Sequence, residues 1–197
     1  MASLKLRKRF GYTSLEHLTL GLMNKLKKLP RVTDVKLDAE LPCKTAEITA
    51  WETKNSVRLP DDMKQFYLST DGFSVKWTYC YSKRKQISVG HLNIPKLRQI
   101  RNLDLDAPGR MFELDRIGDL GVVYLVYRTR ETTRPEIYIM ETDTLKFTFL
   151  AHSFTNYLRM SIVHLGLPYW QLAFASCGLP GWAEQLFLLL APHLLNE

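Results

Sequence analysis

The segment from Trp51 to Trp77 constrains the fold of this chain more than any other part of the sequence. One helix ends inside it, a second helix begins and ends, and a strand begins. Pro60 suits the first turn of the second helix, because its ring fixes φ and an N–H there has no partner in the helix. Asp71-Gly72 ends that helix, and apolar residues alternate from Phe73 onward, as in a strand. We expect this segment to be a structural nucleus.

The remainder of the chain is expected to alternate short helices and strands before it becomes entirely helical. An apolar stripe follows Ser14 and predicts a helix to Lys28, after which Arg31–Leu37 is expected to be a strand. Further strands are predicted at Ile87–Leu92, Arg110–Leu114, Gly121–Arg128, Glu136–Glu141 and Leu145–Leu150, with a short helix at Ile94–Ile100 and a loop at Asn102–Gly109. The polar residues at 82–85 are typical of a hairpin tip. This order predicts an α+β fold with a mixed, mainly antiparallel sheet flanked by helices.

The C-terminal part of the chain is predicted to be a group of short helices beginning at Ser153. A GLPYW motif begins at Gly166 and a GLPGW motif begins twelve residues later, at Gly178. In each motif the glycine suits the end of one helix and the proline the start of the next. Only three charged residues lie beyond residue 152. A C-terminal segment with so few charged residues is expected to be buried, either against the sheet of the same domain or against another protein.

These patterns divide the chain into three parts. We expect a basic flexible leader at residues 1–13, an α+β domain at 14–152, and a helical extension at 153–197 that packs on that domain. The basic start is not followed by an apolar run, so no signal peptide is expected. The stretch Met160–Ala183 lacks charged residues, but glycine and proline interrupt it. We therefore interpret it as buried protein and not as a membrane span.

The net charge of +7 lies at the N-terminus. Residues 1–36 hold nine Lys and Arg against two acidic residues, and the remaining residues hold 18 of each sign. Such an excess could attract nucleic acid, an anionic membrane or an acidic protein surface, or it could be no more than a solvated helix face and leader. The leader residues that would steer toward an acidic partner are Lys5, Arg7, Lys8 and Arg9.

The sequence offers no catalytic constellation. It contains no glycine-rich phosphate loop, no pair of histidines at metal-binding spacing and no GxSxG motif. Asp61, Asp62 and Asp71 could hold a cation, but helix N-terminal and turn positions explain all three. Cys177 and His164 lack a third group to orient the histidine. Three cysteines without a CxxC pair fit a reducing compartment. We expect no catalytic, metal or cofactor site and no binding of nucleic acid or membrane.

Several short motifs of the chain match those of a known superfamily. They are Trp51-Glu52, Asn55, Leu59-Pro60, Asp62, Phe66-Tyr67, Thr70-Asp71-Gly72-Phe73, Leu150-Ala151 and Ser153-Phe154. In these positions the chain resembles the SUKH superfamily, which includes Smi/Knr cell-wall regulators and bacterial toxin-immunity proteins. The resemblance implies a mixed sheet flanked by helices.

A closer likeness involves both ends of the chain. Leu15–Gly21 and His164–Gln171, with Ala173-Phe174, look like segments of the non-catalytic subunits of tubulin polyglutamylase complexes. This resemblance implies a scaffold subunit without a cofactor, which acts beside a tubulin-tyrosine-ligase-like enzyme and other subunits and helps to assemble or target the ligase. It also implies a location in the cytoplasm at microtubules, the centrosome or the cilium base. Tubulin tails are acidic, so the basic leader could steer the complex toward them.

The helical end is the expected partner surface. The residues selected for it are Tyr169, Trp170, Phe174, Trp182 and Phe187, and the alternative for each is a place in the core of this chain. Another class of function stays open, namely a stand-alone SUKH-type regulator or toxin-immunity-like binding protein. A third possibility is a hydrolase that the motifs do not reveal.

Overall fold

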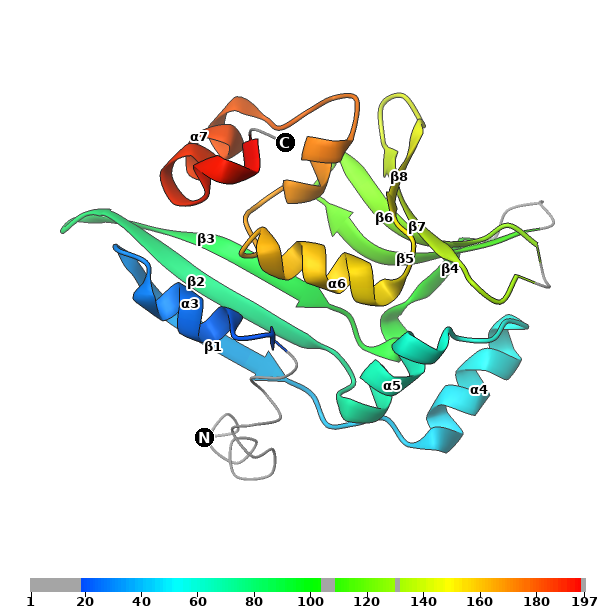
Figure 1. The fold of residues 1–197 in the computed structure, drawn as a ribbon. Helices are drawn as coiled ribbons and strands as arrows, with labels where there is room; N and C mark the ends of the chain where they lie inside the picture. Colours follow the sequence, from blue (N-terminus) through cyan, green and yellow to red (C-terminus); the bar gives the residue numbers. More distant parts are fainter. Residues whose placement is uncertain (1–18, 104–108, 130–131, 196–197) are drawn as a thin grey trace.

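The computed structural model describes residues 19–103, 109–129 and 132–195. Its strands form two sheets in which every described pairing is antiparallel, and the strand orders are β1-β2-β3 and β4-β5-β6-β7-β8 (Figure 1). The first sheet comprises β1 (Val32–Ala39), β2 (Phe73–Ser82) and β3 (Lys85–Ile94). The second comprises β4 (Arg101–Leu103), β5 (Arg110–Ile117), β6 (Gly121–Tyr127), β7 (Glu136–Glu141) and β8 (Phe147–Ala151).

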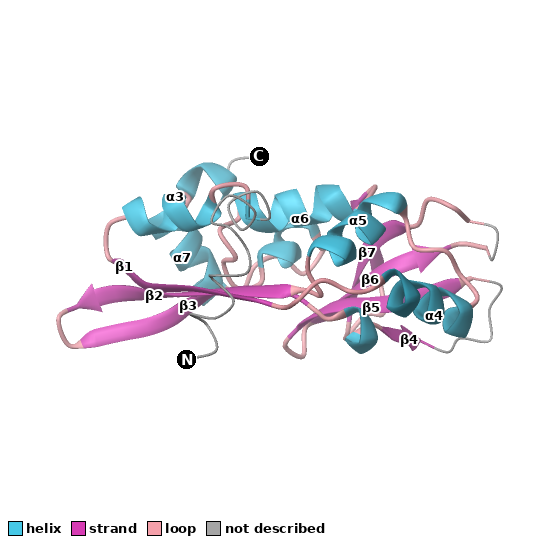
Figure 2. Ribbon diagram, turned by 90° about the horizontal axis from the view of Figure 1, so that it is seen from below, coloured by secondary structure: helices cyan, strands magenta, loops and turns pink. Residues whose placement is uncertain are grey.

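The helices complete an α+β fold, as expected. The described α-helices are α3 (Leu22–Lys28), α4 (Thr45–Asn55), α5 (Asp61–Ser69), α6 (Phe154–Val163) and α7 (Gly181–Leu190). Three short 3-10 helices accompany them: η1 (Leu97–Gln99), η2 (Trp170–Phe174) and η3 (Pro192–Leu195). Figure 2 shows α3, α5 and α6 on one side of the sheets. Apolar side chains of both sheets belong to one hydrophobic core; among them are Trp77, Phe112 and Leu125.

The turn at Thr70-Asp71-Gly72 joins four elements. The Thr70 hydroxyl lies 2.9 Å from the Glu40 carbonyl oxygen, and the Asp71 carboxylate accepts a hydrogen bond of 2.8 Å from the Leu97 N–H of η1. Gly72 has φ +92°, and a Cβ there would lie 2.5 Å from the Ile94 carbonyl oxygen. A glycine is therefore required at this point. The turn holds α5, the start of β2 and the ends of β1 and β3 together.

Three predicted boundaries were wrong. The helix expected at Ile94–Ile100 is the end of β3 followed by η1, because the Asp71 carboxylate holds the Leu97 N–H in a single short turn. The loop expected from Asn102 begins with β4, which pairs with β5. The first helix is interrupted by a turn at Leu20 and Gly21, where φ is positive, between helical Thr19 and α3. Residues 14–18 lie outside the described part.

The C-terminal segment docks on the first sheet through Trp77. The Trp77 indole Nε1 donates a hydrogen bond of 2.9 Å to the Leu165 carbonyl oxygen, and a Cβ at Gly90 would overlap the indole ring. The Gly166 carbonyl oxygen accepts a bond of 2.8 Å from the His91 N–H. A Cβ at Gly166, where φ is +64°, would press on Leu92. The first GLP motif therefore lies directly on β3. The division into leader, domain and extension stays a prediction.

Candidate functional site

The five aromatic residues selected for the partner surface fall into two groups. Trp170 is 3% exposed and Phe187 is fully buried, so both are core residues of this chain and the expectation that they face a partner was wrong. Phe174 and Trp182 are 44% and 52% exposed, and Tyr169 is partly buried. The candidate surface is thereby reduced to Tyr169, Phe174 and Trp182.

Trp170 and Phe187 are buried because they surround His164 at the end of α6. The His164 ring stacks on the Trp170 ring with centroids 4.8 Å apart, and the Phe187 ring lies 6.2 Å from it. The Tyr157 ring, two helical turns before His164 on α6, has its centroid 5.6 Å from that of the Trp170 ring. These rings attach η2 and α7 to α6 and serve as packing, which sequence periodicity alone does not distinguish from an interface.

Helix α7 has an apolar side that no described residue covers. Its buried side consists of Ala183, Leu186 and Phe187, while Leu188 and Leu189 are more than half exposed on the other side, with Trp182 at the helix start. A helix that is apolar almost all round is normally buried on all sides. We call Trp182, Leu188 and Leu189 the α7 outer face. Sequence analysis missed the two leucines, although the uncharged run after Glu184 contained the signal.

Tyr169 fixes the position of Trp182. The Trp182 ring meets the Tyr169 ring edge-on, with centroids 5.2 Å apart. Tyr169 itself lies over the turn between β5 and β6, where a Cβ at Gly118 would come within 2.9 Å of its hydroxyl oxygen. Tyr169 therefore positions Trp182 relative to the second sheet, while Leu188 and Leu189 stay exposed.

A partly buried carboxylate anchors the helical end to β5. The Asp115 Oδ2 atom accepts hydrogen bonds from the Tyr157 hydroxyl at 3.2 Å and from Gln171 Nε2 at 3.0 Å. Burial raises the pKa of Asp115 to about 6, against the lowering effect of its hydrogen bonds. The carboxylate thus links α6 and η2 to the second sheet at a cost in solvation.

Stability should therefore depend on pH at Asp115. Because the folded-state pKa of about 6 lies above the ordinary value of 3.8, the folded state keeps this proton up to a higher pH than the unfolded state does. The free-energy cost of holding the ionised Asp115 carboxylate in the folded state is absent below about pH 4 and grows as pH rises toward 6. Asp115→Asn keeps an oxygen acceptor without the charge. We expect it to unfold with a free energy higher than wild type by about 1–3 kcal/mol at pH 7.5, and nearly equal to wild type at pH 4. Urea unfolding at both pH values measures the difference; a variant less stable at pH 7.5 would contradict it.

A second carboxylate holds the segment after η2. The Glu141 Oε1 atom accepts hydrogen bonds from the Ser176 hydroxyl at 2.6 Å and the Ser176 N–H at 2.8 Å. These bonds hold the pKa of Glu141 below its usual value. Glu141 lies at the end of β7, so the segment before α7 is fastened to the second sheet.

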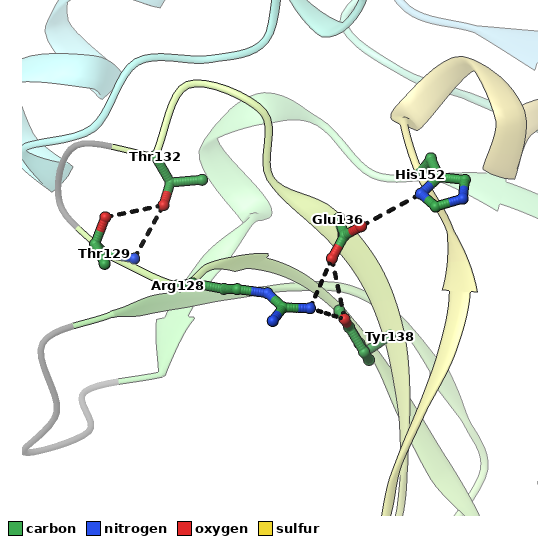
Figure 3. A network of polar contacts seen from close by, with 6 residues as sticks. All are labelled: Arg128, Thr129, Thr132, Glu136, Tyr138 and His152. Carbon is green, nitrogen blue, oxygen red and sulfur yellow. Dashed lines mark hydrogen bonds and ion pairs between the residues drawn. The ribbon is translucent and has the colours of Figure 1, made fainter.

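The network on β6, β7 and β8 in Figure 3 is another structural link. Glu136 accepts hydrogen bonds from the Tyr138 hydroxyl and from Arg128, both at 3.0 Å, and His152 Nδ1 lies 3.3 Å from its other oxygen. The Tyr138 hydrogen bond is the main reason that the pKa of Glu136 is lowered. A carboxylate so stabilised in its charged form is a poor proton acceptor. A shallow hollow lies beside His152, lined mainly by residues of β8 and α6.

The residues considered for chemistry have structural roles. The Asp62 carboxylate accepts a hydrogen bond of 2.8 Å from the Thr155 N–H at the start of α6, and Asp71 holds η1. Cys177 is exposed, and partial desolvation together with the nearby Glu141 carboxylate raises the pKa of its thiol, which disfavours the nucleophilic thiolate. Within the described residues no group of three or more His, Cys, Asp or Glu could hold a metal ion. Every helix in that part of the chain is too short or too polar to cross a bilayer.

The proposed steering residues Lys5, Arg7, Lys8 and Arg9 lie outside the described residues, so their role stays a prediction. The same applies to the leader as a whole.

Comparison with known proteins gives two results. The model of the SMI1 / KNR4 family (SUKH-1) matches residues 42–160, which include the Trp51–Trp77 segment and most of α6. The chain is also similar to proteins named tubulin polyglutamylase complex subunit 2. Identity is 34% to the protein of Rattus norvegicus, 33% to that of Mus musculus and 32% to that of Homo sapiens. Each alignment covers 92% of this chain and 72–73% of the relative. No solved structure matches the chain.

Proposed function

Because this chain belongs to the SMI1 / KNR4 (SUKH-1) family, we propose that it is a non-catalytic scaffold subunit of a tubulin polyglutamylase complex. The observation that carries the proposal is the similarity to three relatives of that name over 92% of this chain. The chain would help to assemble the complex or to bring its ligase to microtubules. Its place would then be the cytoplasm, at microtubules, the centrosome or the cilium base.

The α7 outer face supports a binding role. Its three apolar side chains are exposed at the surface, and a partner that removed them from water would gain free energy in proportion to the apolar area buried, with the tryptophan as the natural anchor. Two of the carboxylates considered for a cation site, Asp62 and Asp71, accept hydrogen bonds from the Thr155 and Leu97 N–H groups and so hold elements together. We therefore assign glutamate ligation to a tubulin-tyrosine-ligase-like partner and assembly to this chain.

Affinity purification tests the proposal. The tagged chain, expressed at its native level, should recover a tubulin-tyrosine-ligase-like enzyme in near-stoichiometric amount, identified by mass spectrometry. The tag alone serves as the control. A bait that elutes as a monomer, or with partners unrelated to tubulin modification, would overturn the proposal and favour a stand-alone SUKH-type regulator.

A further inference from the structure

The charge of the described residues is concentrated in one unit of the fold. Residues 19–39 and 73–94, which form α3 and β1–β3, hold nine Lys and Arg against two Asp. The other described residues hold thirteen positive and thirteen negative side chains. The unit therefore carries +7, and the rest of the described chain carries no net charge.

Folding brings together two basic segments that are far apart in the sequence. Antiparallel pairing places Lys36 directly opposite Lys76, and Lys76 directly opposite His91. Burial and the nearby Lys76 ammonium both lower the pKa of His91. Like charges in opposed strand positions destabilise a sheet. Packing and pairing thus provide no reason for these cations to be neighbours.

The end of the same sheet adds more positive charge. Ser82 pairs with Lys85 across the β2–β3 hairpin, so Lys83 and Arg84 form its tip. Arg31 lies close by, because its carbonyl oxygen accepts a bond of 2.8 Å from the Cys80 N–H. Figure 1 shows this hairpin reaching beyond the body of the domain, with α3 beside it. The basic last turn of α3 suits its helix dipole, but the dipole does not explain the hairpin cations.

We call these nine cations the basic arm. They are Lys25, Lys27, Lys28, Arg31, Lys36, Lys76, Lys83, Arg84 and Lys85. All nine side chains are exposed. None takes part in the five ion pairs found among the described residues, which all lie in the neutral remainder. The arm is therefore charged and solvated; the acidic residues of its unit are Asp34 and Asp38 on β1, and neither forms an ion pair with it among the described residues.

We propose that the basic arm is the docking surface for an unstructured, glutamate-rich polypeptide. This inference rests on the proposed function, because a polyglutamate chain on tubulin is what the relatives' name describes. An extended peptide of about ten residues matches the length of the ten-residue strand β2, about 33 Å. Complementary charge would capture such a peptide quickly and reversibly, with strong dependence on salt.

The composition of the arm favours an acidic peptide over other anionic ligands. Seven of the nine cations are lysines; Tyr79 is buried, and Tyr81 is partly buried with the Lys85 ammonium 5.6 Å from its ring centroid, so no tyrosine of the arm is fully exposed. A surface for single-stranded nucleic acid would present exposed aromatic rings between its cations. A membrane-binding surface would add a row of apolar side chains that insert among lipids. The arm has neither feature among its described residues.

The test measures binding of a fluorescent glutamate peptide of about ten residues to the full chain. Fluorescence anisotropy of the peptide reports binding, at about 50 mM salt. Wild type should bind, and Lys76→Gln/Lys83→Gln/Arg84→Gln/Lys85→Gln should bind at least about tenfold more weakly. The matched control is Lys54→Gln/Arg98→Gln/Arg134→Gln/Lys146→Gln, which removes the same charge from exposed positions of the neutral part. It should bind within about twofold of wild type.

Three outcomes would overturn the inference. The first is no binding of the peptide by wild type. The second is a control variant that loses as much affinity as the arm variant. The third is tighter binding of a single-stranded oligonucleotide or of phosphatidylserine vesicles than of the peptide, with the same sensitivity to the arm substitutions. A leader variant at Lys5, Arg7, Lys8 and Arg9 that alone abolishes binding would also refute it. The assay contains no other subunit. A failed peptide assay therefore leaves the co-purification result intact, and a failed co-purification leaves the peptide result intact.

Discussion

Trp77→Ala is expected to lower the free energy of unfolding by about 4 kcal/mol or more. The indole is almost completely buried, and its N–H is bonded to the Leu165 carbonyl oxygen at 2.9 Å. The substitution leaves a large cavity and an unsatisfied carbonyl oxygen between the first sheet and the C-terminal segment. A loss of this size is a large part of the stability of an ordinary domain. Urea unfolding followed by circular dichroism measures it.

Two companion variants separate the causes. Trp182→Ala removes the same side chain from an exposed position and should cost less than about 1 kcal/mol. Trp77→Phe retains an aromatic ring but removes the hydrogen bond to Leu165, so its cost should lie between those of the two alanine variants. Equal costs at Trp77 and Trp182 would show that the C-terminal segment is not docked on β2 in the way described.

Replacing the α7 outer face is expected to abolish partner recovery while the domain stays folded. Trp182→Ala/Leu188→Ser/Leu189→Ser removes most of the exposed apolar area of α7 without touching Ala183, Leu186 or Phe187. Loss of a central tryptophan anchor at an interface can cost about 2 kcal/mol or more of binding free energy, and the two leucines add buried apolar area, so recovery of the ligase-like enzyme should fall at least about tenfold. Quantitative mass spectrometry of affinity-purified material measures the fall.

A matched control tests whether the position matters. Leu41→Ser/Leu120→Ser/Leu145→Ser removes three exposed leucines from other parts of the surface and should leave recovery unchanged. Thermal unfolding should show similar midpoints for both triple variants. If the α7 variant and this control recovered equal amounts of the ligase-like enzyme, the partner surface would lie elsewhere on the molecule.

The elements governed by local rules could be predicted from the sequence. Pro60 is the N-cap of α5, the helix ends at Ser69 just before the Thr70-Asp71-Gly72 turn, and the alternation from Phe73 is β2. Strands β5 to β7 and the cap at Ser153, whose hydroxyl accepts a hydrogen bond from the Asn156 N–H, also follow their patterns. The strand expected from Leu145 begins only at Phe147, because Leu145 has positive φ at the end of a turn. In each case the residues that determine the element are neighbours in the chain.

The features decided by distant residues could not be predicted. The turn η1 depends on a hydrogen bond between Leu97 and Asp71, 26 positions apart. The burial of Trp170 and Phe187 depends on how α7 folds back on His164. An aromatic residue in a short apolar helix has the same sequence signature whether its own chain or a partner covers it.

The basic arm illustrates the same limit for charge. Counting along the sequence placed the whole excess in residues 1–36, because cations and acids balance over the remainder. The antiparallel register instead separates the hairpin cations from the acids that balance them in the count. Only the fold shows that residues near 30 and near 84 belong to the same three-stranded unit.

Glutamate incorporation by purified material tests the central claim most directly. Wild-type protein recovered from cells with its partners, recombinant chain alone and the recovered α7 variant are each given microtubules, ATP and labelled glutamate. We predict that the recovered wild type labels tubulin, that the chain alone does not, and that the α7 variant has lost the activity at equal amounts of folded bait. Labelling by the chain alone would contradict a non-catalytic role. Full labelling by the α7 variant would contradict assembly through the α7 outer face.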